Sequence, residues 1–490
     1  MHSSAQQHTL PLLDALRECA NKYHAAFYTP GHKRGQGVSS QLATDFKSNV
    51  FKFDLPELPE LDNLFAPQGV IQQAQELAAD AFGAEQTWFL VNGSTCGVEA
   101  AILATCHTGD KIILPRNVHS SSIAGLILSG AIPVFVNPEY DSELDIAHSI
   151  TPASLAAALK QHPDAKAVMI VYPTYYGACA DIAAIASVTH AYNIPLLVDE
   201  AHGGHLAFHL DLPTSALAAG ADLTVQSTHK VLGAMTQASM LHIQGNRIER
   251  DRITKALQLL QSTSPSYLLL ASLDAARQQM ALQGKLLMSR TLQLAREART
   301  RISAIPKLSV LECQSTPGFC ALDLTRLTVT VSDLGITGFE VDEILHAQLG
   351  VTAELPSLQH LTFIISLGNT QEDIEKLVYA FTMVSQRYQK EHLTFKKCLW
   401  DNLFCRMEYS VQISPREAYF ADTQSIPITQ ASDRICAEIV CPYPPGIPVL
   451  MPGELITSYA LDYLQQIQAQ GGLISGCADQ SLGTLKVVQQ

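Results

Sequence analysis

The fold is decided by the run Ile194-Pro-Leu-Leu-Val-Asp199, which leads directly into Glu200-Ala-His202. A short apolar run bounded by polar residues is typical of a strand buried on both faces, as in a parallel sheet covered by helices. Between about Thr87 and His242, similar runs alternate with segments of helical period, which predicts an α/β fold with a mainly parallel sheet. The predicted strands are Thr87–Val91, Lys111–Pro115, Ile132–Val136, Ala167–Tyr172, Pro195–Asp199, Leu223–Gln226 and Ser239–Ile243.

Polar or small residues follow nearly every predicted strand. They are Asn92-Gly-Ser94, Arg116-Asn117, Thr174, Glu200-Ala-His202 and Ser227-Thr-His229. In open α/β sheets, ligands bind beyond the carboxyl ends of the strands. We therefore expect the chemistry of this protein at that edge of the sheet.

The chain beyond this sheet has two further parts. Residues from about Thr254 to Ala304 have the apolar spacing of long helices. A second α+β pattern then comprises Leu308–Cys313, Leu327–Val331, a helix near Phe339–Leu349, Thr362–Ile365 and a helix near Thr370–Gln386. Beyond about Lys390 the pattern changes again and ends in the Pro/Gly-rich Cys441–Glu454, which cannot be a regular helix. We expect an N-terminal segment (1–50), a large domain (51–290), a small α+β domain (291–390) and a C-terminal domain (391–490).

The composition indicates a compact protein that does not bind nucleic acid. Of the 490 residues, 47% are hydrophobic and 16% are charged, and the formal net charge is −14. Phosphate backbones are bound by clustered Lys and Arg, which the sequence lacks, whereas a cationic substrate would be attracted. The eleven scattered cysteines form no zinc-type or CxxC pattern, and this favours reduced thiols in the cytoplasm.

No targeting or membrane segment is expected from the sequence. Met1 to Leu10 is polar and has no signal-peptide core, and the longest apolar stretches, such as Ala124 to Val136, are too short to span a bilayer. Both observations agree with a cytoplasmic protein.

Lys230 is a candidate for a covalent cofactor link. It lies just past a predicted strand in Gln226-Ser-Thr-His-Lys230, where a partly desolvated amine could form an imine. A lone lysine after a strand is usually a surface residue. Here Ser227 and Thr228 add hydroxyls suited to phosphate, and His229 adds a proton-transfer group.

Asp199 ends the strongly apolar strand, so its carboxylate would emerge buried at the edge of the sheet. A buried anion needs a cationic partner, and a protonated pyridine nitrogen would be one. Helix capping and metal binding are alternatives. His202 and His205 suggest a metal site, but no third ligand is visible nearby, so we expect no metal.

The turn Asn92-Gly-Ser-Thr-Cys-Gly97 is a candidate phosphate cradle. Gly93 lets the backbone approach an anion, the following helix offers free N–H groups, and Ser94 and Thr95 add hydroxyl donors. An ordinary helix N-cap is the alternative. His119, at the start of the next helix, could lie flat on a cofactor ring or could simply cap that helix.

These groups together suit pyridoxal phosphate (PLP), the electron sink that removal of carbon dioxide from an amino acid requires. A nucleotide hydrolase is the rival class, because Leu197-Val-Asp-Glu-Ala-His202 resembles the acidic box of helicase-type ATPases. That class also needs a G-x-x-x-x-G-K-[ST] loop, and the only Gly-Lys pair near a helix, Gly284-Lys285, is followed by Leu286. A binding or scaffold protein would leave four strand-end groups unexplained.

Three motifs resemble the ornithine/lysine/arginine decarboxylase family. They are Ser227-Thr-His-Lys-Val-Leu-Gly-Ala-Met-Thr-Gln-Ala-Ser239, Phe27-Tyr-Thr-Pro-Gly-His-Lys33 and Pro442-Tyr-Pro-Pro-Gly-Ile-Pro448. The resemblance runs from about Tyr28 to Glu454. It implies the aspartate-aminotransferase fold (fold type I of PLP enzymes), a PLP-binding large domain, a C-terminal decarboxylase domain, and the short biosynthetic type without an N-terminal wing domain.

The resemblance also implies roles for individual residues. Lys230 would hold PLP as a Schiff base, Asp199 would pair with the pyridine nitrogen, His119 would stack on the ring, and His229 would face the substrate. His229 or Lys230 would return a proton to Cα after carbon dioxide leaves. The remaining predicted cofactor contacts are Ser94, Thr95, Cys96, His202, Ser227, Thr263 and Ser264. Thr263-Ser-Pro265 matches a segment that reaches the phosphate of a neighbouring subunit, which implies a homodimer or higher homo-oligomer with shared sites.

The substrate implied is a basic amino acid, with L-arginine, and hence a place in polyamine biosynthesis, as the first choice. Lysine and ornithine stay open, and an aminotransferase is a more distant alternative. A cationic side chain needs carboxylates at the far end of the pocket. The candidates are Asp54, Glu57, Glu60 and Asp62 in one acidic loop, and Glu438 and Glu454 beside the Pro-rich segment. A solvated acidic loop is the alternative for at least half of them.

Overall fold

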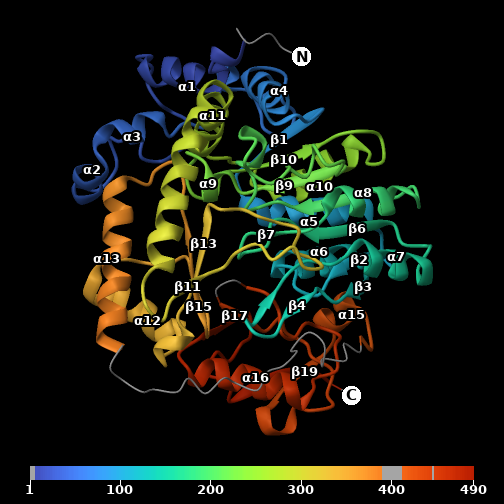
Figure 1. Ribbon diagram of the computed structural model, residues 1–490. Coiled ribbons are helices and arrows are strands. Elements are labelled where there is room, and N and C mark those ends of the chain that lie inside the picture. Colours follow the sequence, from blue (N-terminus) through green and yellow to red (C-terminus); the bar gives the residue numbers. More distant parts are fainter. Residues whose placement is uncertain (1–5, 389–410, 444–445, 490) are drawn as a thin grey trace. The chain divides into compact units, whose positions relative to one another are not determined.

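The computed structural model describes residues 6–388, 411–443 and 446–489 (Figure 1). The chain divides into two compact units. The first unit comprises Met1–Ala104 and Val198–Met288, and the second comprises Thr105–Leu197 and Ser289–Gln490. The predicted domain boundary near residue 390 lies outside the described residues, as do Pro444 and Pro445 of the Pro-rich motif.

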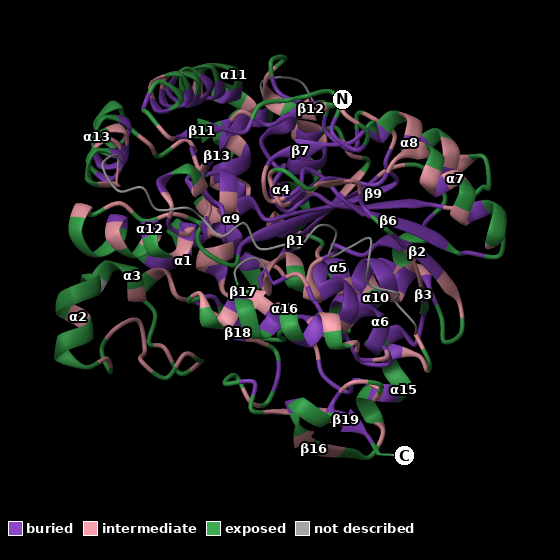
Figure 2. Ribbon diagram, turned by 60° about the horizontal axis from the view of Figure 1, so that its bottom comes forward, coloured by how far each residue is buried: buried purple, intermediate pink, exposed green. Residues whose placement is uncertain are grey.

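The predicted α/β sheet is confirmed. Its seven strands have the order β1-β10-β9-β8-β6-β2-β3, and each agrees with a predicted run to within one residue at either end. The bounds are β1 Gln86–Leu90, β2 Lys111–Pro115, β3 Ile132–Val136, β6 Ala167–Val171, β8 Leu196–Asp199, β9 Leu223–Gln226 and β10 Ser239–Ile243. Strands such as β1, β6 and β9 are buried along most of their length (Figure 2).

One strand departs from the parallel pattern. β2 pairs parallel with β3 and β6, whereas β10 runs antiparallel to both β1 and β9. A parallel return after β9 would need a crossover covered by a helix of ordinary length. The connection between β9 and β10 contains only the four-residue helix α9 (Thr228–Val231), so the chain turns back beside β9.

The first unit contains several α-helices besides α9, of which α4 and α5 pack on strands of its sheet. They are α1 (Pro11–Asn21), α2 (Ser40–Phe46), α3 (Ser48–Phe53), α4 (Val70–Phe82), α5 (Gly93–Thr105), α10 (Arg250–Leu260) and α11 (Tyr267–Ser303), of which α5 and α11 end in the second unit. The helical stretch expected from Thr254 to Ala304 is therefore two helices. Helix α5 packs so closely on β1 and β9 that a Cβ at Gly97 would lie 2.6 Å from Val225 Cγ1 and 2.7 Å from Leu90 Cδ1.

The second unit contains a separate four-stranded sheet of order β11-β13-β15-β14. Its strands are β11 (Ser309–Val310), β13 (Arg326–Thr330), β14 (Leu355–Pro356) and β15 (His360–Ile364), covered by α12 (Gly338–Ile344), a π-turn (Leu345–Leu349) and α13 (Gln371–Tyr388). The predicted strand Leu308–Cys313 is wrong beyond Val310. The N–H of Leu311 still donates to Thr328 O at 2.9 Å, but its carbonyl accepts a hydrogen bond from the Arg299 guanidinium.

The rest of the second unit consists of helices near the main sheet and a C-terminal part with its own apolar core. The helices are α6 (Ser120–Ser129), α7 (Pro152–Gln161), α8 (Ile182–His190), α15 (Pro415–Phe420) and α16 (Ser458–Ala469). The small strand pairs are β4 (Tyr140–Asp141) with β5 (Ile146–Ala147), β7 (Ala178–Cys179) with β12 (Ala321–Leu322), β16 (Thr423–Pro427) with β19 (Thr484–Val488), and β17 (Cys441–Tyr443) with β18 (Leu473–Ser475).

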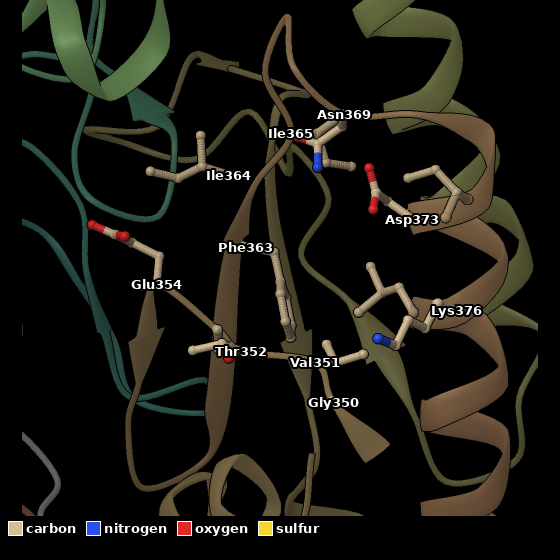
Figure 3. A pocket seen from close by; sticks show the side chains of 13 residues that line it. Gly350, Val351, Thr352, Glu354, Phe363, Ile364, Ile365, Asn369, Asp373 and Lys376 are labelled. Atoms are coloured by element: carbon tan, nitrogen blue, oxygen red, sulfur yellow. The ribbon is translucent and has the colours of Figure 1, made fainter. Parts of the chain in front are cut away.

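A pocket of about 430 Å³ lies within the second unit, between β15, α13 and residues 350–354. Figure 3 shows Phe363 at its centre and Asp373 and Lys376 on the α13 side. None of the predicted site residues lines this pocket. In the described part of the chain, no helix is both long enough and apolar enough to cross a membrane.

Candidate active site

Lys230 lies on α9, directly beyond the carboxyl end of the fully buried β9. Its side chain is half-buried, and Nζ lies 3.1 Å from His202 Nε2. The structure thus brings together two residues that lie 28 positions apart in the chain. An amine held against an imidazole in a partly desolvated place can exchange a proton with it.

Asp199 is the last residue of β8 and is 6% exposed. Its Oδ1 accepts a hydrogen bond from the backbone N–H of Ala201 at 3.2 Å. Burial raises the pKa of Asp199, while the positive charge of Lys230 acts in the opposite direction. The acid and the lysine therefore interact electrostatically, and the carboxylate would gain from a further cation.

The predicted cradle joins two loops of the first unit. Gly93 has φ +73°, which favours glycine, and its N–H donates to Gln237 O at 3.0 Å. Ser227 Oγ, after β9, donates to Ser94 Oγ, at the start of α5, at 2.7 Å. Two hydroxyls from different loops thus meet beside the amino end of a helix, an arrangement that suits an anion.

Thr95 and Cys96 differ in their surroundings. Thr95 is exposed. Cys96 is buried and its thiol lies 3.2 Å from Gly93 O. Burial raises the pKa of Cys96 to about 12, so it is a neutral thiol bonded to the turn itself. It is Ser94, rather than Thr95 or Cys96, that meets Ser227.

Helix α9 also carries the hydroxyl of Thr228 and the imidazole of His229. Thr228 is 1% exposed, and its Oγ1 has no hydrogen-bond partner among the described residues. His229 Nδ1 lies 3.0 Å from Ala238 O. Because a carbonyl can only accept, Nδ1 carries the proton there, and a neutral His229 would have Nε2 as its basic nitrogen.

His119 belongs to the second unit, where it is the N-cap of α6. Its Nδ1 accepts a hydrogen bond from the N–H of Ser121 at 3.2 Å, which is the capping role considered as the alternative. Gly446 of the Pro-rich motif lies against the ring: a Cβ there would be 3.3 Å from His119 Nε2, and Gly446 O accepts from Ser120 N at 3.1 Å. The stacking role stays a prediction.

Sequence reasoning missed Arg116, which holds the Pro-rich segment within the second unit. Its guanidinium lies 3.0 Å from Glu454 Oε2, with side-chain exposures of 1% and 3%, and donates to the carbonyls of Pro448 and Val449 at 2.6 and 3.1 Å. The sequence did contain a signal for this residue, because Arg116 directly follows an apolar strand. An arginine that is buried at such a place requires a carboxylate partner.

The candidate substrate carboxylates have structural partners. Glu454 pairs with Arg116, and Glu438 accepts hydrogen bonds from the N–H groups of Ala478 and Lys486, both at 2.7 Å. Both are buried. They stabilise the C-terminal part of the second unit, so the structure gives no reason to assign either to a substrate side chain.

The acidic loop of the first unit is likewise engaged. Asp62 accepts from the N–H of Gly69 at 2.7 Å and of Ile71 at 3.1 Å at the start of α4. Burial opposes ionisation, but backbone hydrogen bonds, including that from Gly69, lower its pKa. The other partners are Lys22 for Glu60 (2.7 Å), Asn63 for Glu57 (2.7 Å) and His32 for Asp54 (3.0 Å). Asp62 therefore caps the start of α4.

Thr263 and Ser264 lie in the break between α10 and α11. Both are exposed, whereas Pro265 is buried, and Ser264 N donates to Ser262 Oγ at 3.1 Å. Their predicted contact with another subunit is untested. As for a metal, no group of three or more His, Cys, Asp or Glu side chains within 6–388, 411–443 and 446–489 is arranged to hold one.

The sequence matches the domain models of one known protein family. Residues 10–319 match the Orn/Lys/Arg decarboxylase major domain, and residues 397–487 match the Orn/Lys/Arg decarboxylase C-terminal domain. The chain is 39% identical to an arginine decarboxylase of Bacillus subtilis over 486 residues, covering 99% of both chains. It is 38% identical to an arginine decarboxylase of Bacillus anthracis over 490 residues, covering 99% of this chain and 98% of the relative.

The solved structures agree on the fold. The lysine decarboxylase LdcF of Francisella novicida superposes with a TM-score of 0.87 at 23% identity, covering 99% of this chain and 82% of that one. An alanine–glyoxylate aminotransferase from Nostoc sp. superposes with a TM-score of 0.52 at 17% identity, covering 66% of this chain and 88% of that one. The predicted fold type I is thereby confirmed.

Proposed function

This chain belongs to the ornithine/lysine/arginine decarboxylase family, and on that premise we propose that it converts L-arginine into agmatine and carbon dioxide, with PLP held on Lys230. The observation that carries the proposal is the electrostatic interaction of Lys230 with the buried Asp199, at the carboxyl ends of neighbouring strands. Decarboxylases of this family are PLP-dependent amino acid decarboxylases.

The residues present fit PLP. An amine, a buried acid and two hydroxyls 2.7 Å apart supply partners for an aldehyde, a pyridinium and a phosphate. The Thr228 hydroxyl is a buried donor with no partner in the described part of the chain, and buried polar groups are ordinarily satisfied. When bound, PLP supplies an electron sink for the bond that loses carbon dioxide.

Lys230 and Asp199 have complementary tasks in this proposal. Lys230 would hold the cofactor through its amine, and His202, whose Nε2 lies 3.1 Å from Nζ, would accept or return the proton of that amine. Asp199 is buried and gains from a cation beyond Lys230. Its charge would keep a proton on the pyridine nitrogen, and that proton in turn keeps Asp199 ionised.

The proton that replaces carbon dioxide on Cα would come from His229 or Lys230. Because Nδ1 of His229 is bonded to Ala238 O, Nε2 is the atom proposed to hold the transferable proton. Orientation of the substrate carboxylate decides between decarboxylation and transamination. In this proposal His119 stacks on the cofactor ring. Thr95 and Cys96 form part of the turn near the cofactor phosphate.

We also propose that this chain forms a homodimer or a higher homo-oligomer. Thr263 and Ser264 are exposed in the single chain, which agrees with a contact to the phosphate of a partner subunit in a homodimer. The chain would act in the cytoplasm. Its domains would be an N-terminal segment (1–50), a large PLP-binding domain (51–290), a small domain (291–390) and a C-terminal domain (391–490).

Arginine is favoured over lysine and ornithine by the relatives. Four relatives named arginine decarboxylase are 37% to 39% identical to this chain over 91% to 99% of its length. The more distant relatives are two lysine decarboxylases, at 25% and 23% identity, and a biodegradative arginine decarboxylase, at 24%. The carboxylate that binds the guanidinium stays unassigned, since all six candidates have other partners.

Release of carbon dioxide from arginine, lysine and ornithine, assayed in parallel, tests the function. We expect turnover of arginine, loss of turnover in Lys230→Ala, and retained turnover in Lys255→Ala, which removes an exposed lysine of α10. Release from lysine or ornithine alone would refute the substrate, and release from none would refute the reaction.

A further inference from the structure

Four buried side chains of the first unit form a continuous row of hydrogen bonds. Gln226 Nε2 donates to Glu200 Oε2 at 2.8 Å, Gln226 Oε1 lies 3.2 Å from His242 Nε2, and His242 Nδ1 lies 2.7 Å from Thr87 Oγ1. Their exposures are between 0% and 3%. None of these residues has a role in the proposed reaction.

The row crosses the strands that carry the proposed active site. Thr87 lies on β1, His242 directly opposite on β10 and Gln226 on β9, while Glu200 follows β8. These strands are neighbours in the sheet, and Figure 1 shows β1, β10 and β9 side by side. Two members are next to site residues in the chain, because Glu200 follows Asp199 and Gln226 precedes Ser227.

The hydrogen bonds of the row have a single direction. An ionised Glu200 can only accept, so Gln226 must present its amide N–H to Glu200 and its carbonyl to the ring. His242 must then donate from Nε2, and its Nδ1 must accept from the Thr87 hydroxyl. Burial lowers the pKa of His242 to about 3, so the ring is neutral and one tautomer satisfies the whole row.

Glu200 is the end at which this direction is set. Its other oxygen accepts from the N–H of Ala216 at 2.8 Å, so the hydrogen bonds found for it come from neutral donors. Burial raises the pKa of Glu200 to about 7, and the Ala216 and Gln226 hydrogen bonds oppose this. A charge held only by dipoles depends on their alignment.

We propose that Glu200 is a positioning residue: its charge orients the row Gln226–His242–Thr87, and the row holds the ends of β8 and β9, and with them Asp199 and Ser227, in the arrangement that binds the cofactor. The inference rests on the proposed function in one respect, namely that Asp199 and Ser227 contact PLP.

Glu200→Gln tests the direction of the row without changing its shape. A glutamine at 200 that accepts from Ala216 must donate to Gln226, which then turns its amide, so His242 must accept at Nε2 and donate from Nδ1. Solid-state ¹⁵N spectra of the full-length holoenzyme labelled in histidine, recorded well above the raised pKa of Glu200 so that its carboxylate is ionised, report which nitrogen is protonated. The His242 signals are assigned by their loss in His242→Gln. We expect protonated Nε2 in wild type and protonated Nδ1 in Glu200→Gln. Protonated Nδ1 in wild type, or no change in the variant, would overturn the proposal.

Cofactor affinity tests the consequence. We expect the dissociation constant for PLP to rise about tenfold in Glu200→Gln and about threefold in Thr87→Val, the effects of about one net hydrogen bond or less. Thr224→Val is the matched control, because Thr224 lies opposite His242 on β9, is 0% exposed, and its hydroxyl has no hydrogen-bond partner in the described chain. It should bind PLP within twofold of wild type.

The outcomes separate this inference from the proposed function. If wild type binds no PLP, the proposed function fails, and the site residues lose their assigned role with it. If wild type binds PLP and both row variants bind it equally well, the inference is wrong and the proposed function stands. A lower thermal midpoint in the variants with unchanged PLP affinity would show that the row only stabilises the fold, and would likewise overturn the inference.

Discussion

Two buried acids, one in each unit, have opposite relations to their surroundings. Glu454 in the second unit has a full cationic partner, since Arg116 bonds both of its oxygens and is itself buried. Asp199 in the first unit has one backbone hydrogen bond and the charge of a half-buried lysine. The charge of Glu454 is neutralised by an arginine of the same chain, so this acid stabilises the fold. The charge of Asp199 would be stabilised further by a ligand that brings a positive charge. The difference is the physical basis for assigning only Asp199 to the active site.

The largest expected effect comes from Asp199→Asn, which keeps the shape and removes the charge. We expect turnover to fall by about 10³-fold, the effect of losing a preorganised electrostatic contact to the reacting group. The stability of the cofactor-free protein should stay the same or increase, because burial raises the pKa of Asp199 and its ionised form is therefore costly. Kinetics and chemical denaturation measure the two effects. Asp251→Asn, an exposed acid of α10, is the control. Retained turnover would remove the contrast between the two acids.

Glu454→Gln should show the reverse pattern. Removing the charge leaves the Arg116 guanidinium buried without its counter-ion, so we expect a loss of about 3–5 kcal/mol in the free energy of unfolding. Urea denaturation measures it. Glu60→Gln, in the exposed pair with Lys22, should leave stability unchanged, since exposed pairs contribute little. Equal effects of the two substitutions would mean that the buried pair does not hold the Pro-rich segment.

The pH dependence of the stability tests the ionisation of a third buried acid, Glu200. Its pKa is raised to about 7 from an ordinary 4.5, so between these values the folded protein binds more protons than the unfolded chain. Stability should therefore fall as pH rises from 5 to 8, by about 3 kcal/mol in total. Glu200→Gln lacks this term, so the difference between wild type and variant isolates it in denaturation experiments at each pH. Parallel stability profiles would show that Glu200 does not titrate in this range.

The smallest effect tests the packing beneath the cradle. In Gly97→Ala the new methyl group would meet Val225 and Leu90 at distances that require side chains to move. We expect a loss of about 1–3 kcal/mol. Gly368→Ala is the control, because nothing lies within 4 Å of a Cβ at that position. Equal thermal midpoints for both variants would show that α5 can shift away from the sheet at little cost.

Local patterns in the sequence predicted most of the sheet, and they selected Lys230 and Asp199, which interact electrostatically in the structure. Apolar runs such as Leu223–Gln226 need only their own residues to be recognised, and Lys230 and Asp199 follow such runs directly. The antiparallel course of β10 was not predicted, because strand direction depends on how the connection crosses the sheet rather than on the strand's own residues.

The sequence patterns did not predict contacts between distant parts of the chain. Arg116 and Glu454 are 338 positions apart, and His242 and Thr87 are 155 apart, so no spacing within the sequence could pair them. For the same reason, the acids chosen for the substrate side chain proved to have structural partners.

The most direct test of the account is to reduce the purified protein with borohydride in the presence of PLP and to identify the labelled peptide by mass spectrometry. We expect a single pyridoxyl group on Lys230 in wild type and no label in Lys230→Ala. A label on another lysine, or no covalent label at all, would contradict this expectation.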